Sequence, residues 1–195
     1  MKLTAIFLLL ASASLAQPPT KIGPHHLGET FDEWLSASNI DLAAICGPHK
    51  GRAAADLKFQ CKGLTQLRAS GLGQADSFIG SQRFNWQFMN GMVAQAEANY
   101  SMPNTAQQVR FLTESYGPPA STKIVPYQNA LGAKWDCLEA RWYLPDGAAI
   151  MANESVMNLP YTGPTLWLTV TFLSKERIAW EAARHPGAVN PYAAK

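Results

Sequence analysis

Two stretches of the chain share a pattern in which a tryptophan and a second apolar residue alternate toward an Asn-Gly or Asp-Gly pair. They read WQFMNG from Trp86 and WYLPDG from Trp142. Alternation with a period of two is typical of a strand with one buried face, and Asn-Gly or Asp-Gly tolerates the positive φ angles of a tight hairpin turn. The pattern predicts antiparallel hairpins that turn at Asn90-Gly91 and at Asp146-Gly147.

Further elements are expected around these hairpins. Strands are predicted in LKFQCKGL, SQRFNWQF, VAQAEANY, CLEARWYL, AAIMANES and TLWLTVTFL, whereas GLGQADSFIG is expected to be a loop. Thr30 with Glu33 has the spacing of a capping box at a helix start, and Thr105 with Gln108 repeats it. IDLAAIC is expected to form a short helical turn, and Ser174 to cap a C-terminal helix. The chain is therefore predicted to be an α+β protein with helices packed on antiparallel sheet.

The order helix, strands, hairpin occurs twice. This predicts two tandem related halves, one over residues 27–103 and one over 104–174, followed by a C-terminal helix and tail over 175–195. Internal duplication is the preferred explanation. Chance recurrence of so short a motif is the alternative, because turn geometry alone also produces it.

The capped helices at Thr30 and Thr105, together with the two hairpins, resemble the repeat of the beta-lactamase-inhibitor-protein-like fold. In that fold a helical hairpin packs on a small antiparallel sheet, and the unit can be duplicated. The segment FLTESYGPP is also similar to the small envelope-lipoprotein version of the fold. The resemblance covers Leu27 to Ser174, and the chain departs from it by an extra loop in the first half and an added C-terminal helix. It implies a binding or scaffold role and carries over no functional residues.

The first residues have the pattern of a secretory signal peptide. Lys2 precedes a short apolar run, and a small-x-small cleavage pattern ends at Ala16. Residues 1–16 are expected to be removed, which leaves a flexible N-terminal tail over 17–26. Gln17 rather than cysteine follows the cleavage position, so lipid attachment is not expected. No later segment is apolar over enough residues to span a membrane, and a secreted or periplasmic protein is predicted.

Three cysteines occur in the chain. In an oxidising compartment Cys46 and Cys61 are natural partners, because a loop of about 15 residues closed by a disulfide stabilises the fold by roughly 3 kcal/mol. Cys137 is then left as a buried free thiol on the same strand face as Trp135. Pairing of Cys137 with either of the other two is the alternative that the sequence leaves open.

The sequence contains no complete catalytic or metal-binding motif. CGPH differs by one residue from the Cys-Gly-Pro-Cys of thioredoxin-like enzymes, but no buried strand is expected before it. The histidines show none of the spacings that zinc ligands require; they are His25, His26, His49 and His185. No cofactor or metal is therefore predicted, and no catalytic residue is assigned.

Aromatic side chains are the remaining candidates for a binding surface. Trp135, Tyr143 and Trp167 alternate with apolar residues and are expected to lie on the sheet face opposite the core. If that face is exposed, it can receive a protein, peptide or glycan; the alternative is burial by a second layer. Nucleic acid is not an expected partner, because the net charge is +2 and no basic stripe is present.

These observations predict an exported, non-catalytic binding or scaffold protein of the bacterial envelope. A secreted hydrolase with a thiol or carboxylate site assembled from distant positions, such as Cys137 or Asp136, is the alternative from another class. An inhibitor of a secreted hydrolase is the third hypothesis.

Overall fold

The computed structural model describes residues 18–51, 54–101, 105–128, 132–159 and 163–186. Within them helices pack on an antiparallel sheet, which confirms the predicted α+β class. The helices are α1 (Phe31–Ala37), α2 (Leu42–Cys46), α3 (Ala54–Ser70), α4 (Thr105–Tyr116) and α5 (Lys175–Arg184). The strands are β1 (Lys21–Ile22), β2 (His25–His26), β3 (Gly73–Ile79), β4 (Gln82–Met89), β5 (Met92–Ser101), β6 (Ser121–Gln128), β7 (Lys134–Tyr143), β8 (Ala149–Leu159) and β9 (Gly163–Leu173).

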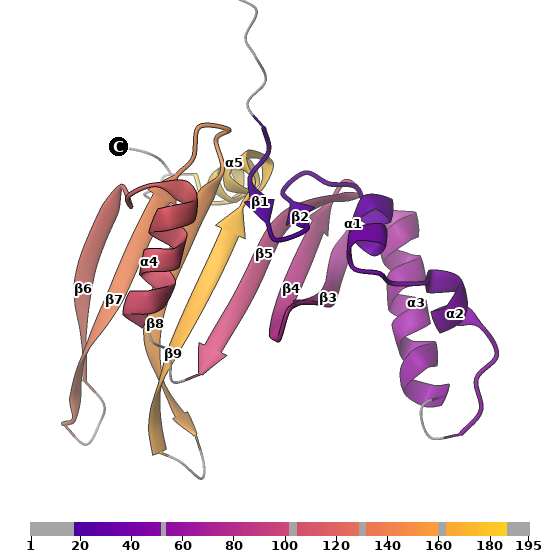
Figure 1. Ribbon diagram of the computed structural model, residues 1–195, viewed down its shortest axis with the longest axis horizontal. Helices are drawn as coiled ribbons and strands as arrows, with labels where there is room; N and C mark the ends of the chain where they lie inside the picture. Colours follow the sequence, from indigo (N-terminus) through magenta and orange to yellow (C-terminus); the bar gives the residue numbers. More distant parts are fainter. Residues whose placement is uncertain (1–17, 52–53, 102–104, 129–131, 160–162, 187–195) are drawn as a thin grey trace, which may run out of the picture.

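The long strands form one seven-stranded sheet in the order β3-β4-β5-β9-β8-β7-β6, to which both predicted halves contribute. One meander runs through β3, β4 and β5, the other runs from β6 to β9, and antiparallel pairing of β5 with β9 joins them. In Figure 1, α1 and α4 lie in front of this sheet, α3 runs beside its β3 edge, and α5 lies behind its upper end. We call the surface under α1 and α4 the helix face and the opposite surface the open face.

The tryptophans of the two similar hairpins lie in one cross-strand row of the helix face. The row runs through Trp86, Ala96, Phe172, Ile150 and Trp142. Both indoles are buried, and residues paired across antiparallel strands point to the same face. The two hairpins lie on opposite sides of β9. Superposing β4 on β7 and β5 on β8 would therefore turn one hairpin over and place its indole on the opposite face of the sheet. The shared pattern therefore gives no support to an internal duplication, which stays a prediction.

The two hairpins also differ in the type of their turns. Asn90 and Gly91 have φ angles of 52° and 75°, which confirms the predicted two-residue turn. At the second corner only Gly147 has a positive φ, of 86°, and its N–H donates to the carbonyl of Leu144. The prediction that Asp146-Gly147 turns in the same way is wrong, because Pro145 begins a longer turn and Asp146 instead accepts a hydrogen bond from Ala148 N.

The N-terminal tail predicted as flexible over 17–26 is ordered from residue 18 onward. β1 and β2 pair with each other, and the His25 side chain is fully buried against the Trp86 ring. His25 Nδ1 lies 2.8 Å from a carboxylate oxygen of Glu29, which is also buried. The sequence interpretation missed the spacing of four residues between these two polar groups. It had treated the Pro- and Gly-flanked segment as a tail.

α1 begins as predicted. The Thr30 side chain accepts from Glu33 N, and the Glu33 carboxylate accepts from Thr30 N at 2.7 Å, so the capping box is confirmed. This contact lowers the pKa of the Glu33 carboxyl, because the hydrogen bonds from the Thr30 backbone and side chain favour the ionised form. The short helix α2, which ends at Gly47, and the Ser174 cap of α5 are also confirmed.

Two predictions about the segment before the first hairpin are wrong. LKFQCKGL was expected to be a strand, but it lies within α3 and Phe59 is 81% exposed. Over a longer window the inward-facing residues recur at helical spacing. GLGQADSFIG was expected to be a loop, but most of it forms β3, whose buried positions are Ala75 and Ser77. Small and polar residues at these positions do not produce an alternating apolar pattern.

Candidate functional site

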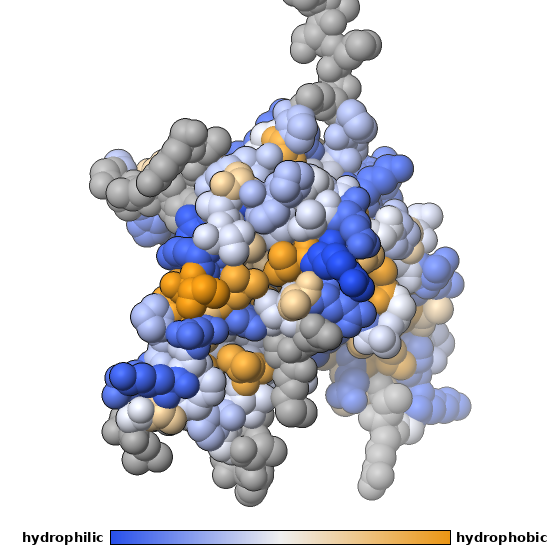
Figure 2. Space-filling model, turned by 60° about the vertical axis from the view of Figure 1, so that its left-hand side comes forward, coloured by the Kyte–Doolittle hydropathy of each residue, from blue (hydrophilic) through white to orange (hydrophobic). Residues whose placement is uncertain are grey.

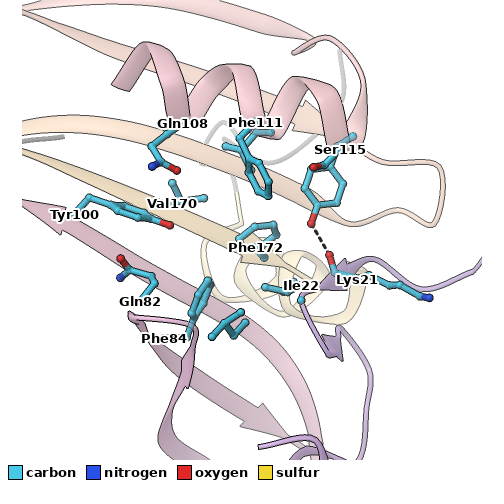
Figure 3. A pocket seen from close by; sticks show the side chains of 14 residues that line it. Lys21, Ile22, Gln82, Phe84, Tyr100, Gln108, Phe111, Ser115, Val170 and Phe172 are labelled. Atoms are coloured by element: carbon cyan, nitrogen blue, oxygen red, sulfur yellow. Dashed lines mark hydrogen bonds between the residues drawn. The ribbon is translucent and has the colours of Figure 1, made fainter. Parts of the chain in front are cut away.

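An apolar groove crosses the middle of the helix face, between α4 and the N-terminal strand β1. It has a volume of about 420 Å³, which is within the usual range for small-molecule pockets. Its floor is formed by Phe84, Val170 and Phe172 from β4 and β9. Figure 3 shows α4 along one side of these residues and the turn between β1 and β2 near the other.

The groove exists because the central strand β5 carries small residues and none of the described helices lies directly over it. On β5 the helix-face positions that pair with Phe172 and Val170 are Ala96 and Ala98, both fully buried. α4 lies on the side of the second meander, and α1 packs its Phe31 ring against Phe88 on the other side. The rings of Phe84 on β4 and Phe172 on β9 therefore line the groove.

α4 supplies one wall of the groove. Leu112 is buried in the core, whereas Phe111 is 61% exposed and, in Figure 3, its ring points down toward Phe172. Figure 2 shows that apolar surface gathers in a band across the middle of this side of the molecule, with more hydrophilic surface above and below. An exposed phenylalanine at the mouth of an apolar channel offers contact surface to a ligand without being needed for the core.

One end of the groove is closed by a contact between distant segments. The Tyr116 hydroxyl at the end of α4 donates to the backbone carbonyl of Lys21 in β1, drawn as a dashed line in Figure 3. The Tyr116 ring also meets the Phe172 ring edge-on, with centroids 5.9 Å apart. Burial raises the pKa of Tyr116 to about 12, so the phenol stays protonated and continues to donate at neutral pH.

The opposite end is polar and uncharged. Tyr100 from β5, Gln108 from α4 and Gln82 from β4 come together there, as Figure 3 shows. Gln82 donates its amide N–H groups to the carbonyls of Arg83 and Asn99, which leaves its own carbonyl oxygen as an acceptor. Burial raises the pKa of the Tyr100 phenol, which therefore stays neutral.

The aromatic residues predicted as a binding surface lie on the open face, as the strand alternation indicates. Trp135, Tyr143 and Trp167 are each half-buried, and the structure separates them along β7 and β9. Trp167 donates its indole N–H to Asn99 at 3.2 Å, and Trp135 packs beside Tyr127 at a ring distance of 5.7 Å. The three therefore share a face without forming one cluster, and their binding role stays a prediction.

The predicted thiol partners are brought together. Cys46 in α2 and Cys61 in α3 lie at disulfide distance, with Cα atoms 5.1 Å apart. Cys137 is buried outside this pair. Burial raises the pKa of its thiol, and the carboxylates of Glu154 and Asp136 raise it further, so the nucleophilic thiolate is disfavoured.

The sequence interpretation missed the groove residues or assigned them other roles. Gln108 was interpreted as part of a capping box, but Thr105 is already the first residue of α4, and its hydroxyl donates to Glu154. Tyr116 lies on the apolar face of α4 together with Val109 and Leu112. Phe111, which lies off that apolar face, was the available signal, because an amphipathic helix seldom places a phenylalanine on its solvent side without a use.

The groove has the make-up of a binding site. Among the described residues that line it there is no histidine, cysteine or carboxylate, and Lys21 carries the only charge. Among the described helices, none is long and apolar enough to cross a membrane. No protein-family model, no curated protein and no solved structure matches the chain.

Proposed function

We propose that this protein is an exported binding protein of the bacterial envelope that holds a small apolar molecule in the groove between α4 and β1. The observation that carries the proposal is the groove itself, whose floor and walls are mostly Phe, Val, Leu and Ile side chains. Burying apolar ligand surface there is favourable by about 25 cal/mol for each Å² removed from water. The resemblance to the beta-lactamase-inhibitor-protein-like repeat is a prediction in its own right and agrees with a binding role.

The chemistry of the described residues favours binding over catalysis. The hydrolase alternative relied on Cys137 or Asp136, but the Cys137 thiol is buried with a raised pKa and both residues lie outside the groove. Ser115 lines the groove, yet no histidine or carboxylate in the described lining is placed to activate its hydroxyl. Export is supported by the N-terminal signal pattern together with the cysteine pair at disulfide distance.

Titration of the exported protein with the neutral apolar dye Nile red tests this function. We expect saturable binding of one dye per chain. Phe111→Ala should weaken binding about fivefold, because roughly 1 kcal/mol of apolar contact at the groove mouth is lost. Phe59→Ala is the matched control, since Phe59 is also an exposed helical phenylalanine but lies on α3, away from the groove.

The dye affinity of Phe59→Ala should equal that of the unmodified protein. Absence of saturable dye binding would contradict the proposal, as would equal weakening by both substitutions, since that would indicate nonspecific adsorption to exposed rings.

A further inference from the structure

The uncharged polar end of the groove indicates what kind of head group the ligand carries. Resting on the proposed binding function, we propose that the groove selects an amphiphile with a neutral hydrogen-bonding head, an amide or a hydroxyl, and rejects one with a carboxylate. The head lies among Tyr100, Gln108 and Gln82, and the apolar body lies over the floor toward Tyr116.

The hydrogen-bonding groups at this end are available to a ligand. Among the described residues, the Tyr100 hydroxyl and the Gln108 amide have no hydrogen-bond partner, and both side chains are half-buried. Together with the Gln82 carbonyl oxygen they present donors and acceptors in one place. An amide head, which both donates and accepts, matches this set, whereas a carboxylate only accepts and would face the Gln82 oxygen unfavourably.

The charges near this end also disfavour an anion. The cross-strand row that carries Tyr100 continues through Leu168 to Glu154 on the same face. Two strand spacings separate Tyr100 from Glu154, which is about 10 Å. A ligand carboxylate would therefore be placed near a protein carboxylate, across largely apolar side chains that screen poorly.

The positive end of α4 does not compensate, because it already has a negative partner. Thr105, the first residue of the helix, donates its hydroxyl to the Glu154 carboxylate, which also accepts from Leu138 N at 2.7 Å. The helix dipole at this end is thus matched by Glu154. Lys21, the one cation of the described lining, is at the opposite end, and Figure 3 shows its side chain directed away from the groove.

A cationic head is disfavoured for a different reason. Glu154 would attract it, but that carboxylate already accepts from Thr105 and Leu138 and lies outside the lining, whose described residues include no carboxylate. An ammonium group would lose its hydration in exchange for neutral partners only, and an unpaired buried charge is costly.

Displacement of Nile red by four ligands of equal chain length tests the head-group preference. The probes are octanamide, octanol, octanoate and octylammonium at neutral pH. We expect octanamide and octanol to bind at least tenfold more tightly than either ion. Tyr100→Phe and Gln108→Leu should each weaken octanamide by about twofold to twelvefold, the range for one neutral hydrogen bond of roughly 0.5–1.5 kcal/mol.

Tyr127→Phe is the matched control for Tyr100→Phe, because it removes a phenolic hydroxyl from β6, outside the groove lining. Its octanamide affinity should be unchanged. Saturable Nile red binding by Tyr100→Phe and Gln108→Leu would show that these variants keep a folded groove. If Nile red binds but octanoate or octylammonium binds as tightly as octanamide, the head-group inference is wrong while the binding function stands. If the unmodified protein binds no Nile red, the binding function itself fails.

Discussion

Tyr116 donates its phenolic proton to the backbone carbonyl of Lys21, a residue 95 positions earlier in the chain. This contact joins the end of α4 to the N-terminal strand β1 and closes one end of the apolar groove. Thr20 supports the same segment from the other side, because its backbone N–H donates to Asp146 at 2.8 Å. The groove wall therefore depends on a segment that is held by these polar contacts together with the buried Ile22 side chain.

The Tyr116 contact predicts a loss of stability in alkali. The pKa of Tyr116 is raised in the folded protein from 10.0 to about 12, so the stability it contributes is fully present below pH 10 and is lost as the pH rises toward 12. Unfolding midpoints measured across this window should fall more steeply for the unmodified protein than for Tyr116→Phe. If the unfolding midpoints of the two proteins fall equally with pH, ionisation of the Tyr116 phenol does not destabilise the fold.

The cysteine arrangement predicts a single free thiol. Alkylation of the exported protein, unfolded without reductant, should give one adduct on Cys137, because Cys46 and Cys61 are at disulfide distance. Reduction should lower the free energy of unfolding by roughly 3 kcal/mol for a loop of this length. Intact-mass measurement and peptide mapping decide the pairing. An adduct on Cys46 or Cys61 in the unreduced protein would mean that the pairing is different.

Gly71 is predicted to tolerate no side chain. Its φ is +66°, and a Cβ built there would lie 2.6 Å from the backbone nitrogen of Gly91, whose N–H donates to the Gly71 carbonyl. Gly71→Ala should therefore destabilise the fold by more than about 1 kcal/mol, because backbone must move at the first hairpin corner. Denaturant unfolding measures the change.

Gly63→Ala in α3 is the control for that substitution, since nothing lies within 4 Å of a Cβ at Gly63. A helix-interior alanine in place of glycine should stabilise the protein by up to about 1 kcal/mol. Equal destabilisation by the two substitutions would contradict the close packing of Gly71 on the hairpin corner.

The open face carries a separate prediction about partners. Trp167 lines a pocket of the open face together with Asp76, Asn85 and Glu97, a mixture of aromatic and hydrogen-bonding groups suited to a sugar ring. If this face binds a glycan, isothermal titration with a neutral β-linked glucan oligosaccharide should show binding that Trp167→Ala weakens roughly tenfold. Trp135→Ala, on the same face but packed on Tyr127, should leave the affinity unchanged. If the unmodified protein gives no heat of binding, or if both variants lose it equally, this face does not bind the glycan.

Local signals in the sequence predicted the fold where one residue decides the geometry. The Thr30 capping box, the Asn90-Gly91 turn and the Ser174 cap are of this kind, because each places a hydrogen bond or a positive φ within a few residues. α3 and β3 were misassigned because their patterns depend on what lies beside them. Ser77, for example, is buried since it accepts a hydrogen bond from the indole of Trp86.

Apart from Phe111, the groove gave no local signal in the sequence. Its lining comes from segments as distant as β1, α4 and β9, and its floor residues Phe84, Val170 and Phe172, taken alone, have the pattern of ordinary core positions. The strand order, which places β9 between β5 and β8, brings Val170 and Phe172 to the floor of the groove. A pairing of strands so far apart in the chain is not encoded by any short motif.

The most direct test of the central claim is the dependence of affinity on ligand chain length. Displacement of Nile red by alkyl amides of increasing length measures it in the unmodified protein. Each added methylene should tighten binding by about fourfold, corresponding to roughly 0.8 kcal/mol, until the body reaches Tyr116 and the affinity levels off. An affinity that does not change with chain length would mean that the apolar floor of Phe84, Val170 and Phe172 does not hold the ligand, and would contradict the account.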